Sequence, residues 1–145
     1  EIRLSLVGSE MCIRDRSMIL ITGGRGQGKL DFARSLAAFE IGGSQIADGE
    51  TDPFEAAFSR PVIKHFERYI KRGMQNQLDC EAFLRRILSD NPDAIVIADE
   101  IGCGIVPVDA FERAYRDEAG RLCQLLAREA GAVYRVIFGI GQQIK

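Results

Sequence analysis

The sequence lacks several features that would point to particular classes of protein. No apolar run approaches the ~20 residues that a membrane-spanning helix needs, so we expect no membrane span. The formal net charge is only −2, which gives no indication of nucleic-acid binding. The four cysteines show no C-x-x-C spacing and predict a cytoplasmic protein with reduced thiols: Cys12, Cys80, Cys103 and Cys123.

What remains is the composition of an ordinary globular domain. The chain has 145 residues, of which 46% are hydrophobic and 28% charged, enough for one domain with its own core. Residues 1–17, EIRLSLVGSEMCIRDRS, are similar to the peptide obtained when a sequencing adapter is translated in frame. We therefore expect 1–17 to be a non-native extension and 18–145 to be one domain; a genuine N-terminal extension is the alternative.

The first segment of that domain changes its hydrophobic period around a cluster of glycines. Met18–Ile21 is a short apolar run rich in β-formers, which predicts a buried strand. Phe32, Leu36 and Phe39 follow at the spacing of one helix face, which predicts a helix over about 30–41. The glycines between them fit the pattern G-x-x-x-x-G-K of a phosphate-binding loop.

This context gives the loop residues a chemical role. Glycine lets the backbone turn tightly and approach a phosphate closely, while successive N–H groups and the helix N-terminus attract the anion. Lys29 would reach the β- and γ-phosphates of GTP or ATP, but Leu30 stands where Ser or Thr normally binds Mg²⁺. The alternative is a glycine-rich turn without a ligand. The predicted nucleotide-binding residues are Gly23, Gly24, Arg25, Gly26, Gln27, Gly28, Lys29 and Leu30.

An acidic pair follows a second apolar run. Residues 94–98, AIVIA, predict a central parallel strand buried on both faces, and Asp99 and Glu100 come directly after it. Ligands of open α/β sheets bind beyond the carboxyl ends of the strands. Asp99 and Glu100 could therefore hold Mg²⁺ or orient a hydroxyl nucleophile. The alternative is a pair of solvated carboxylates in a turn.

The middle of the chain carries positive charge and the one histidine. Pro61 can open a helix whose apolar face holds Ile63, Phe66 and Ile70 and which ends at Gly73. His65 would lie in that helix, either as a structural or exposed residue or as a nucleophile or base. A basic stripe along it would be a solvated face or would face phosphate: Arg60, Lys64, Arg68, Lys71 and Arg72.

The remaining segments complete an alternation of strands and helices. We expect a short strand over 44–47, a short helix ending near Phe58, and a helix capped by Asp79. Asp109 and Glu112 predict the capping box of the longest helix, which is followed by a strand over 132–138 and a tail. This order predicts an α/β, three-layer P-loop nucleotide-binding fold with a small, mainly parallel sheet.

Three segments together resemble one enzyme family. Residues 100–107, EIGCGIVP, residues 115–121, YRDEAGR, and residues 139–145, GIGQQIK, are similar to E-V-G-x-G-I-V-P, F-R-D-x-A-G-R and G-I-G-x-x-I-K. These patterns occur, in this order, in the bifunctional adenosylcobinamide kinase/adenosylcobinamide-phosphate guanylyltransferase family. Residues 18–29 resemble the opening strand and loop of the same family.

The resemblance implies a role in cobalamin biosynthesis. The kinase passes a γ-phosphate to the hydroxyl of adenosylcobinamide, and the guanylyltransferase joins GMP to that phosphate through a guanylylated histidine. It further implies GTP or ATP with Mg²⁺, a cytoplasmic homo-oligomer, most often a trimer, and catalytic roles for Lys29, Glu100 and, as the one histidine, His65. Because Leu30 replaces the family's Ser, the alternative is a non-catalytic nucleotide-binding or regulatory relative.

Overall fold

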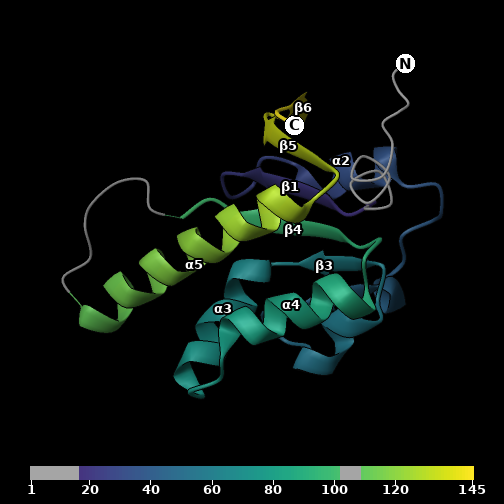
Figure 1. Cartoon of the computed structure of the whole chain (residues 1–145). Coiled ribbons are helices and arrows are strands. Elements are labelled where there is room, and N and C mark those ends of the chain that lie inside the picture. Colours follow the sequence, from purple (N-terminus) through teal and green to yellow (C-terminus); the bar gives the residue numbers. More distant parts are fainter. Residues whose placement is uncertain (1–16, 102–108) are drawn as a thin grey trace, which may run out of the picture.

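The computed structural model describes residues 17–101 and 109–145, and these form alternating strands and helices around one sheet (Figure 1). Residues 1–16 and 102–108, which include most of the family-like segment after Glu100, lie outside the described residues. The strands are β1 (Ile19–Gly23), β2 (Ile46–Asp48), β3 (Val62–Lys64), β4 (Ile95–Asp99), β5 (Ala132–Ile137) and β6 (Ile140–Gln143). The helices are α2 (Lys29–Leu36), α3 (Phe66–Gln75), α4 (Cys80–Asp90) and α5 (Ala110–Glu129), with 3-10 turns at Gly43–Gln45 and Phe54–Phe58.

The six described strands form a single sheet in the order β2-β3-β4-β1-β5-β6. All neighbouring pairs are parallel except β5 and β6, which form an antiparallel hairpin. Parallel neighbours require crossover connections, which here contain helices or, between β2 and β3, the 3-10 turn at Phe54–Phe58. The mainly parallel sheet that the alternating pattern predicts is confirmed.

Helices cover both faces of the sheet and make three layers. Helices α3, α4 and α5 lie on one face and α2 on the other (Figure 1). The strands alternate between the two cores: on β1, Leu20 packs toward α3–α5 and Ile21 toward α2. Strand β4 is buried on both faces in the same way, so the continuous apolar run at 94–98 is a central strand as predicted.

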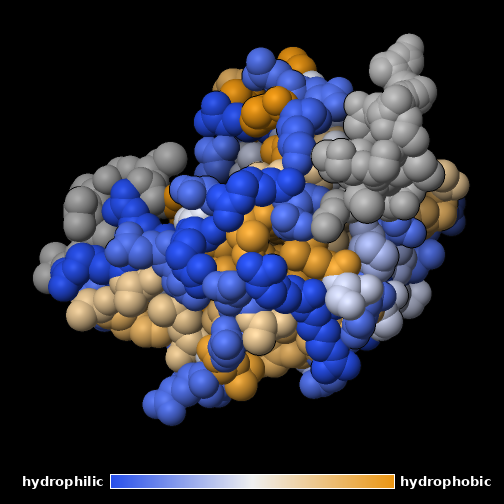
Figure 2. Space-filling view, in the orientation of Figure 1, coloured by the Kyte–Doolittle hydropathy of each residue, from blue (hydrophilic) through white to orange (hydrophobic). Residues whose placement is uncertain are grey.

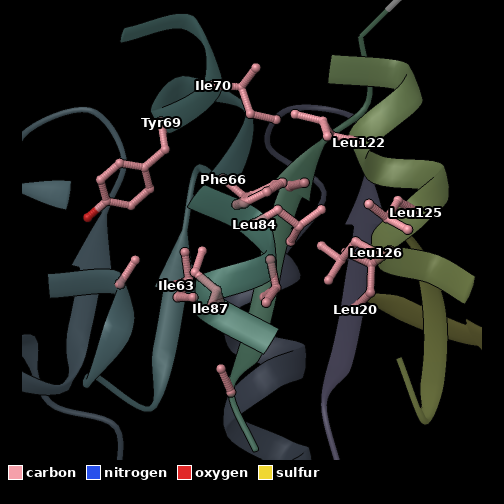
Figure 3. Packing of buried hydrophobic residues seen from close by; sticks show 14 of the residues in the cluster. Leu20, Ile63, Phe66, Tyr69, Ile70, Leu84, Ile87, Leu122, Leu125 and Leu126 are labelled. Carbon is pink, nitrogen blue, oxygen red and sulfur yellow. The ribbon is translucent and has the colours of Figure 1, made fainter. Parts of the chain in front are cut away.

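The larger core joins α3 and α5 to the sheet. Phe66 and Ile70 of α3 point toward Leu122 of α5 above the strands (Figure 3). All three side chains are buried almost completely. No helix among residues 17–101 and 109–145 is long and apolar enough to cross a membrane.

The predicted helix beginning at Pro61 is wrong in its first turn. Residues 62–64 form strand β3, and α3 begins only at Phe66. Val62 and Ile63 are β-branched and fully buried between β2 and β4, so tertiary packing prevails over the helical spacing. The basic stripe is consequently divided, because Arg60 and Lys64 lie outside the helix.

Other boundaries also differ from the prediction. Helix α2 ends at Leu36 rather than near residue 41, and α3 continues past Gly73 to Gln75. The predicted C-terminal tail is strand β6, which pairs with β5. Two predicted caps are confirmed: Asp79 accepts the N–H of Ala82, and Asp109 accepts the N–H groups of residues 111 and 112.

Candidate functional site

The carboxyl ends of four parallel strands bring the polar residues of the site to one edge of the sheet. In the strand register Asp48 of β2 lies opposite Lys64 of β3. At the centre of the sheet Gly23 of β1 lies opposite Asp99 of β4, and the N–H of Glu100 donates to the carbonyl of Gly23 at 2.9 Å. The segments that follow these strands therefore meet, as expected for the ligand edge of an open α/β sheet.

The loop between β1 and α2 has the backbone that its glycines predict. Gly26 and Gly28 adopt φ angles of 74° and 89°, in the left-handed region where a side chain would be strained. Gly28 occupies the N-cap of α2 and has no side chain to cap the helix, so the N–H groups of the first turn remain for a ligand. This arrangement suits phosphate.

Lys29 lies at the centre of this loop with its ammonium group held in place. The side chain is only 6% exposed, and Nζ donates to the carbonyl oxygen of Gly24 at 2.7 Å. Nζ also lies 2.7 Å from Oδ1 of Asp99. A buried lysine needs such partners, and together they fix the positive charge at the wall of the cavity described next.

A cavity of about 300 Å³ lies against the loop. Its lining comes from the loop and from the ends of β3 and β4: Arg25, Gly26, Gln27, Gly28, Lys29, Leu30, Asp31, Lys64, His65, Ile97 and Asp99. Seven of these residues form the continuous segment 25–31, and the other four lie at or near the carboxyl ends of β3 and β4. Leu30 lines it without a hydroxyl group and also packs against the core on the α2 side.

His65 lies at the end of β3 rather than within a helix. It adopts the left-handed conformation with a φ of 54°, an uncommon and strained geometry that often occurs at functional positions. Its Nδ1 is 3.1 Å from Oδ1 of Asp48, and Nε2 is 3.9 Å from Oε1 of Glu50. In the neutral imidazole, an ionised Asp48 as acceptor places the proton on Nδ1 and leaves the lone pair on Nε2.

Asp48 is suited to orient the imidazole. Burial raises its pKa, but hydrogen bonds from the backbone of Glu50 and from His65 outweigh that effect and lower the pKa below its usual value. The turn after Asp48 also lies close to the backbone of residues 64 and 65. The N–H group of Gly49 donates to the carbonyl oxygen of Lys64 at 2.8 Å. A methyl group on Gly49 would collide with the carbonyl of His65, so a close approach of two backbones fixes this contact.

The two acidic residues at the end of β4 have different partners. Asp99 faces the cavity and pairs with Lys29. Glu100 accepts two hydrogen bonds from Arg135 of β5, at 2.8 and 3.3 Å, and lines a neighbouring pocket. Among the described residues no cluster of three or more metal-binding side chains occurs. Mg²⁺ commonly takes one or two protein carboxylates and completes its shell with phosphate and water, so Asp99 fits as a single protein ligand.

Glu67 is a buried carboxyl group that the sequence analysis did not select. It is 2% exposed, and Oε1 accepts the N–H of Asp99 at 2.9 Å. Burial, aided by the negative charge of Asp99, raises the pKa of Glu67 despite the hydrogen bond from the Asp99 backbone. Glu67 therefore supports the strand end that carries Asp99. Glu67 lies one turn before Ile70 on the buried face of α3. A charged residue at an apolar position of the helix is the feature of the sequence that could have indicated it.

The turn between β5 and β6 forms hydrogen bonds with Gln27 of the glycine-rich loop. The carbonyl and the side-chain Oε1 of Gln27 accept the N–H groups of Gly139 and Phe138, each at 2.7 Å. Phe138 and Gly139 both have positive φ angles, of 52° and 77°, at the turn between β5 and β6. A methyl group on Gly141 would collide with the ring of Phe32 on α2. These contacts explain physically why glycines recur in the C-terminal segment.

Comparison with known proteins identifies the family of this chain. A family model for cobinamide kinase / cobinamide phosphate guanyltransferase matches residues 62–144, which is more than half of the chain. The chain belongs to this family. The matched range includes His65, Asp99 and Glu100, whereas the glycine-rich loop between β1 and α2 precedes it. The family resemblance seen in the sequence is confirmed.

Two curated relatives of this chain share one name. The bifunctional adenosylcobalamin biosynthesis proteins CobU of Escherichia coli (strain K12) and Salmonella typhimurium (strain LT2) are each 45% identical to this chain over 51 residues. The aligned stretch covers 35% of this chain and 28% of each relative. The similarity therefore establishes kinship over a part of the sequence.

Proposed function

We propose that this protein binds GTP or ATP in the cavity at the carboxyl edge of the sheet and transfers the γ-phosphate to the hydroxyl group of adenosylcobinamide. The observation that carries this proposal is the position of Lys29, whose ammonium group lies 2.7 Å from both Gly24 O and Asp99 Oδ1 beside the cavity. The ammonium is a fixed point charge for the terminal phosphates, and the loop amides supply further donors. Family membership supports the same reaction in cobalamin biosynthesis.

In this reaction the protein contributes positioning and electrostatics. The acceptor oxygen bonds to the γ-phosphorus, the bond to the β-phosphate oxygen breaks, and a nucleoside diphosphate leaves. Mg²⁺, held by Asp99, would neutralise charge on the phosphates. Lys29 offsets charge that develops on the transferred group, and Glu100, in the pocket adjoining Asp99, would orient the acceptor hydroxyl and take its proton.

A second activity, guanylyl transfer through His65, is favoured by the orientation of the imidazole. Nε2 would attack the α-phosphorus of GTP, forming an N–P bond and releasing pyrophosphate. The phosphate of adenosylcobinamide phosphate would then attack, breaking the N–P bond and regenerating the imidazole. The Asp48–Nδ1 contact leaves Nε2 as the nucleophile, and Lys64 lines the same cavity to offset phosphate charge.

The non-catalytic alternative has one observation in its favour. Leu30 lacks the hydroxyl group that usually completes the Mg²⁺ shell, so a nucleotide could bind here without efficient transfer. A regulatory or binding subunit would keep the loop, Lys29 and the family fold. It would not label a histidine or phosphorylate an acceptor.

We also propose a cytoplasmic homo-oligomer, by family resemblance a trimer. Large apolar side chains of the C-terminal hairpin support self-association, since Phe138 is 84%, Ile140 74% and Ile144 60% exposed. Figure 2 shows hydrophobic surface (orange) among hydrophilic residues at the end of the molecule where β5 and β6 lie. Clustered exposed apolar residues are typical of interaction surfaces.

The activities are distinguished by two labels. The chain is incubated with Mg²⁺ and adenosylcobinamide, with γ-labelled or α-labelled GTP, and γ-labelled ATP is tested in parallel. The kinase predicts γ-label on the corrinoid. Guanylyl transfer predicts α-label on the protein that survives denaturation, is released by acid and is lost in His65→Asn. Nucleotide binding without either label would leave the non-catalytic alternative, and failure to bind GTP or ATP would overturn the proposal.

A further inference from the structure

We propose that a basic pocket beside the phosphate-binding loop binds a second phosphate monoester, separate from the nucleotide phosphates held by the loop. The pocket has a volume of about 510 Å³. It is lined by four cationic side chains, one carboxylate and one amide: Arg25, Lys71, Arg68, Arg72, Glu50 and Gln75. We call these six residues the basic pocket. The excess of positive charge selects an anion.

One face of α3 forms most of the basic pocket. Arg68, Lys71, Arg72 and Gln75 are spaced at i, i+3, i+4 and i+7, which brings them to one side of a helix. Buried residues of α3, including Phe66 and Ile70, pack into the core. The core packing therefore fixes the rotation of α3 and aims its basic face at the pocket.

Two arginines of the pocket have donors available for a ligand. Arg25 is exposed on the loop, and within residues 17–101 and 109–145 it has no hydrogen-bond or ion-pair partner. Nε of Arg68 lies 3.7 Å from Glu67 Oε2 and 3.9 Å from Glu50 Oε1, distances longer than a hydrogen bond. A guanidinium group matches phosphate with two parallel hydrogen bonds, so Arg25 and Arg68 are suited to clamp one phosphate.

The other two cations are already committed to structure. Arg72 donates to the carbonyl oxygens of Gly49 and Asp52 at 2.7 and 2.8 Å, and so ties α3 to the turn after β2. Lys71 pairs with Glu112 of α5 at 3.2 Å. These residues contribute charge to the wall, while direct coordination falls to the two arginines. Arg72 is accordingly a poor choice for a binding variant.

The location couples the basic pocket to the nucleotide cavity. Arg25 lines both spaces, and Glu50 lies 3.9 Å from His65 Nε2 as well as from Arg68 Nε. A phosphate in the basic pocket would thus be beside the reacting groups and outside the loop. Its identity as the phosphate of the corrinoid acceptor rests on the proposed function; a second nucleotide is the other source of the same chemistry.

The test fills the loop first and then titrates the basic pocket. With a non-hydrolysable GTP analogue at saturation, calorimetry measures binding of inorganic phosphate, adenosylcobinamide phosphate and GMP in separate titrations. We expect Arg68→Gln to weaken the tightest of these probes at least about tenfold, as loss of a bidentate contact would. Arg85→Gln is the matched control, because Arg85 is an exposed arginine on α4 paired with Glu81. The tighter of the two organic probes identifies the source of the phosphate.

The outcomes separate this inference from the proposed function. Equal affinity in the native chain and Arg68→Gln, or no binding of any of the three probes, would overturn the basic pocket as a phosphate site. Failure of the GTP analogue to bind would instead overturn the proposed function. In that case the titrations are repeated in Lys29→Ala and in the double variant Lys29→Ala/Arg68→Gln. Phosphate binding that is present in Lys29→Ala and lost in the double variant would support the basic pocket by itself.

Discussion

Lys29 and Asp99 meet because the register of two parallel strands sets Gly23 opposite Asp99. We predict that Lys29→Ala weakens triphosphate binding at least about tenfold, since it removes a fixed charge from the phosphates. The helix and strand should remain, because Lys29 contributes its ammonium group rather than core volume. Titration with GTP and ATP measures the loss, and Arg34→Ala, an exposed residue on α2, is the control. Unchanged affinity in Lys29→Ala would show that the loop does not hold phosphate.

Asp48 gives the molecule a pH-dependent contribution to stability. Its pKa in the folded protein is lowered from 3.8, so its stabilising contribution is complete above that value and is lost as the pH falls through the folded pKa. We predict that the free energy of unfolding of the native chain falls more steeply below about pH 4 than that of Asp48→Asn. Urea titrations across this range provide the measurement, with exposed Asp93→Asn as the control. Parallel curves for the native chain and Asp48→Asn would contradict this assignment.

The hairpin of β5 and β6 and helix α2 hold the phosphate-binding loop between them. Gly141 lies against the ring of Phe32, so we predict that Gly141→Ala lowers the free energy of unfolding by about 1–3 kcal/mol through overpacking. Adding Phe32→Leu, which replaces the ring with a smaller side chain, should recover part of the lost free energy of unfolding in a double-mutant cycle. Chemical denaturation measures the free energy of unfolding of the native chain and of the three variants.

A glycine in another element supplies the matched control. A methyl group at Gly120 on α5 would meet nothing within 4 Å, so Gly120→Ala should stabilise the helix by up to about 1 kcal/mol. We therefore expect Gly141→Ala to lower the free energy of unfolding and Gly120→Ala to raise it. Equal effects at both positions would mean that the reduced freedom of the unfolded backbone, and not the Phe32 contact, determines the change in the free energy of unfolding at Gly141.

At the scale of the whole molecule, the exposed apolar side chains of the C-terminal hairpin make the proposed self-association testable. We predict that the native chain self-associates and that Phe138→Asn shifts it toward the monomer without loss of helix or strand content. Asparagine tolerates the φ of 52° at this position, so the backbone turn should survive. Sedimentation velocity at several concentrations, with circular dichroism, makes the comparison. A native monomer at all concentrations, or the same assembly in Phe138→Asn, would exclude the hairpin as the interface.

Several parts of the fold and site could be predicted because they depend on near neighbours. The strand, loop and helix around Lys29, the buried strand at 94–98 and the caps at Asp79 and Asp109 follow from local spacing and capping chemistry. The start of α3 could not be predicted in this way. Ile63 also fits the helical spacing of Phe66 and Ile70, and only the burial of residues 62–64 between β2 and β4 makes the segment a strand.

The sequence by itself determined the strand, glycine-rich loop and helix around Lys29, the alternation of strands and helices, and the family. Those properties are written in consecutive residues, where a glycine, a period or a motif acts over a few positions. Only the tertiary structure decided that Asp48 holds His65, that Gln27 is braced by the C-terminal hairpin, and that Asp99 and Glu100 face different partners. Each of these contacts joins distant segments, and strand order and register, which local pattern does not specify, bring them together.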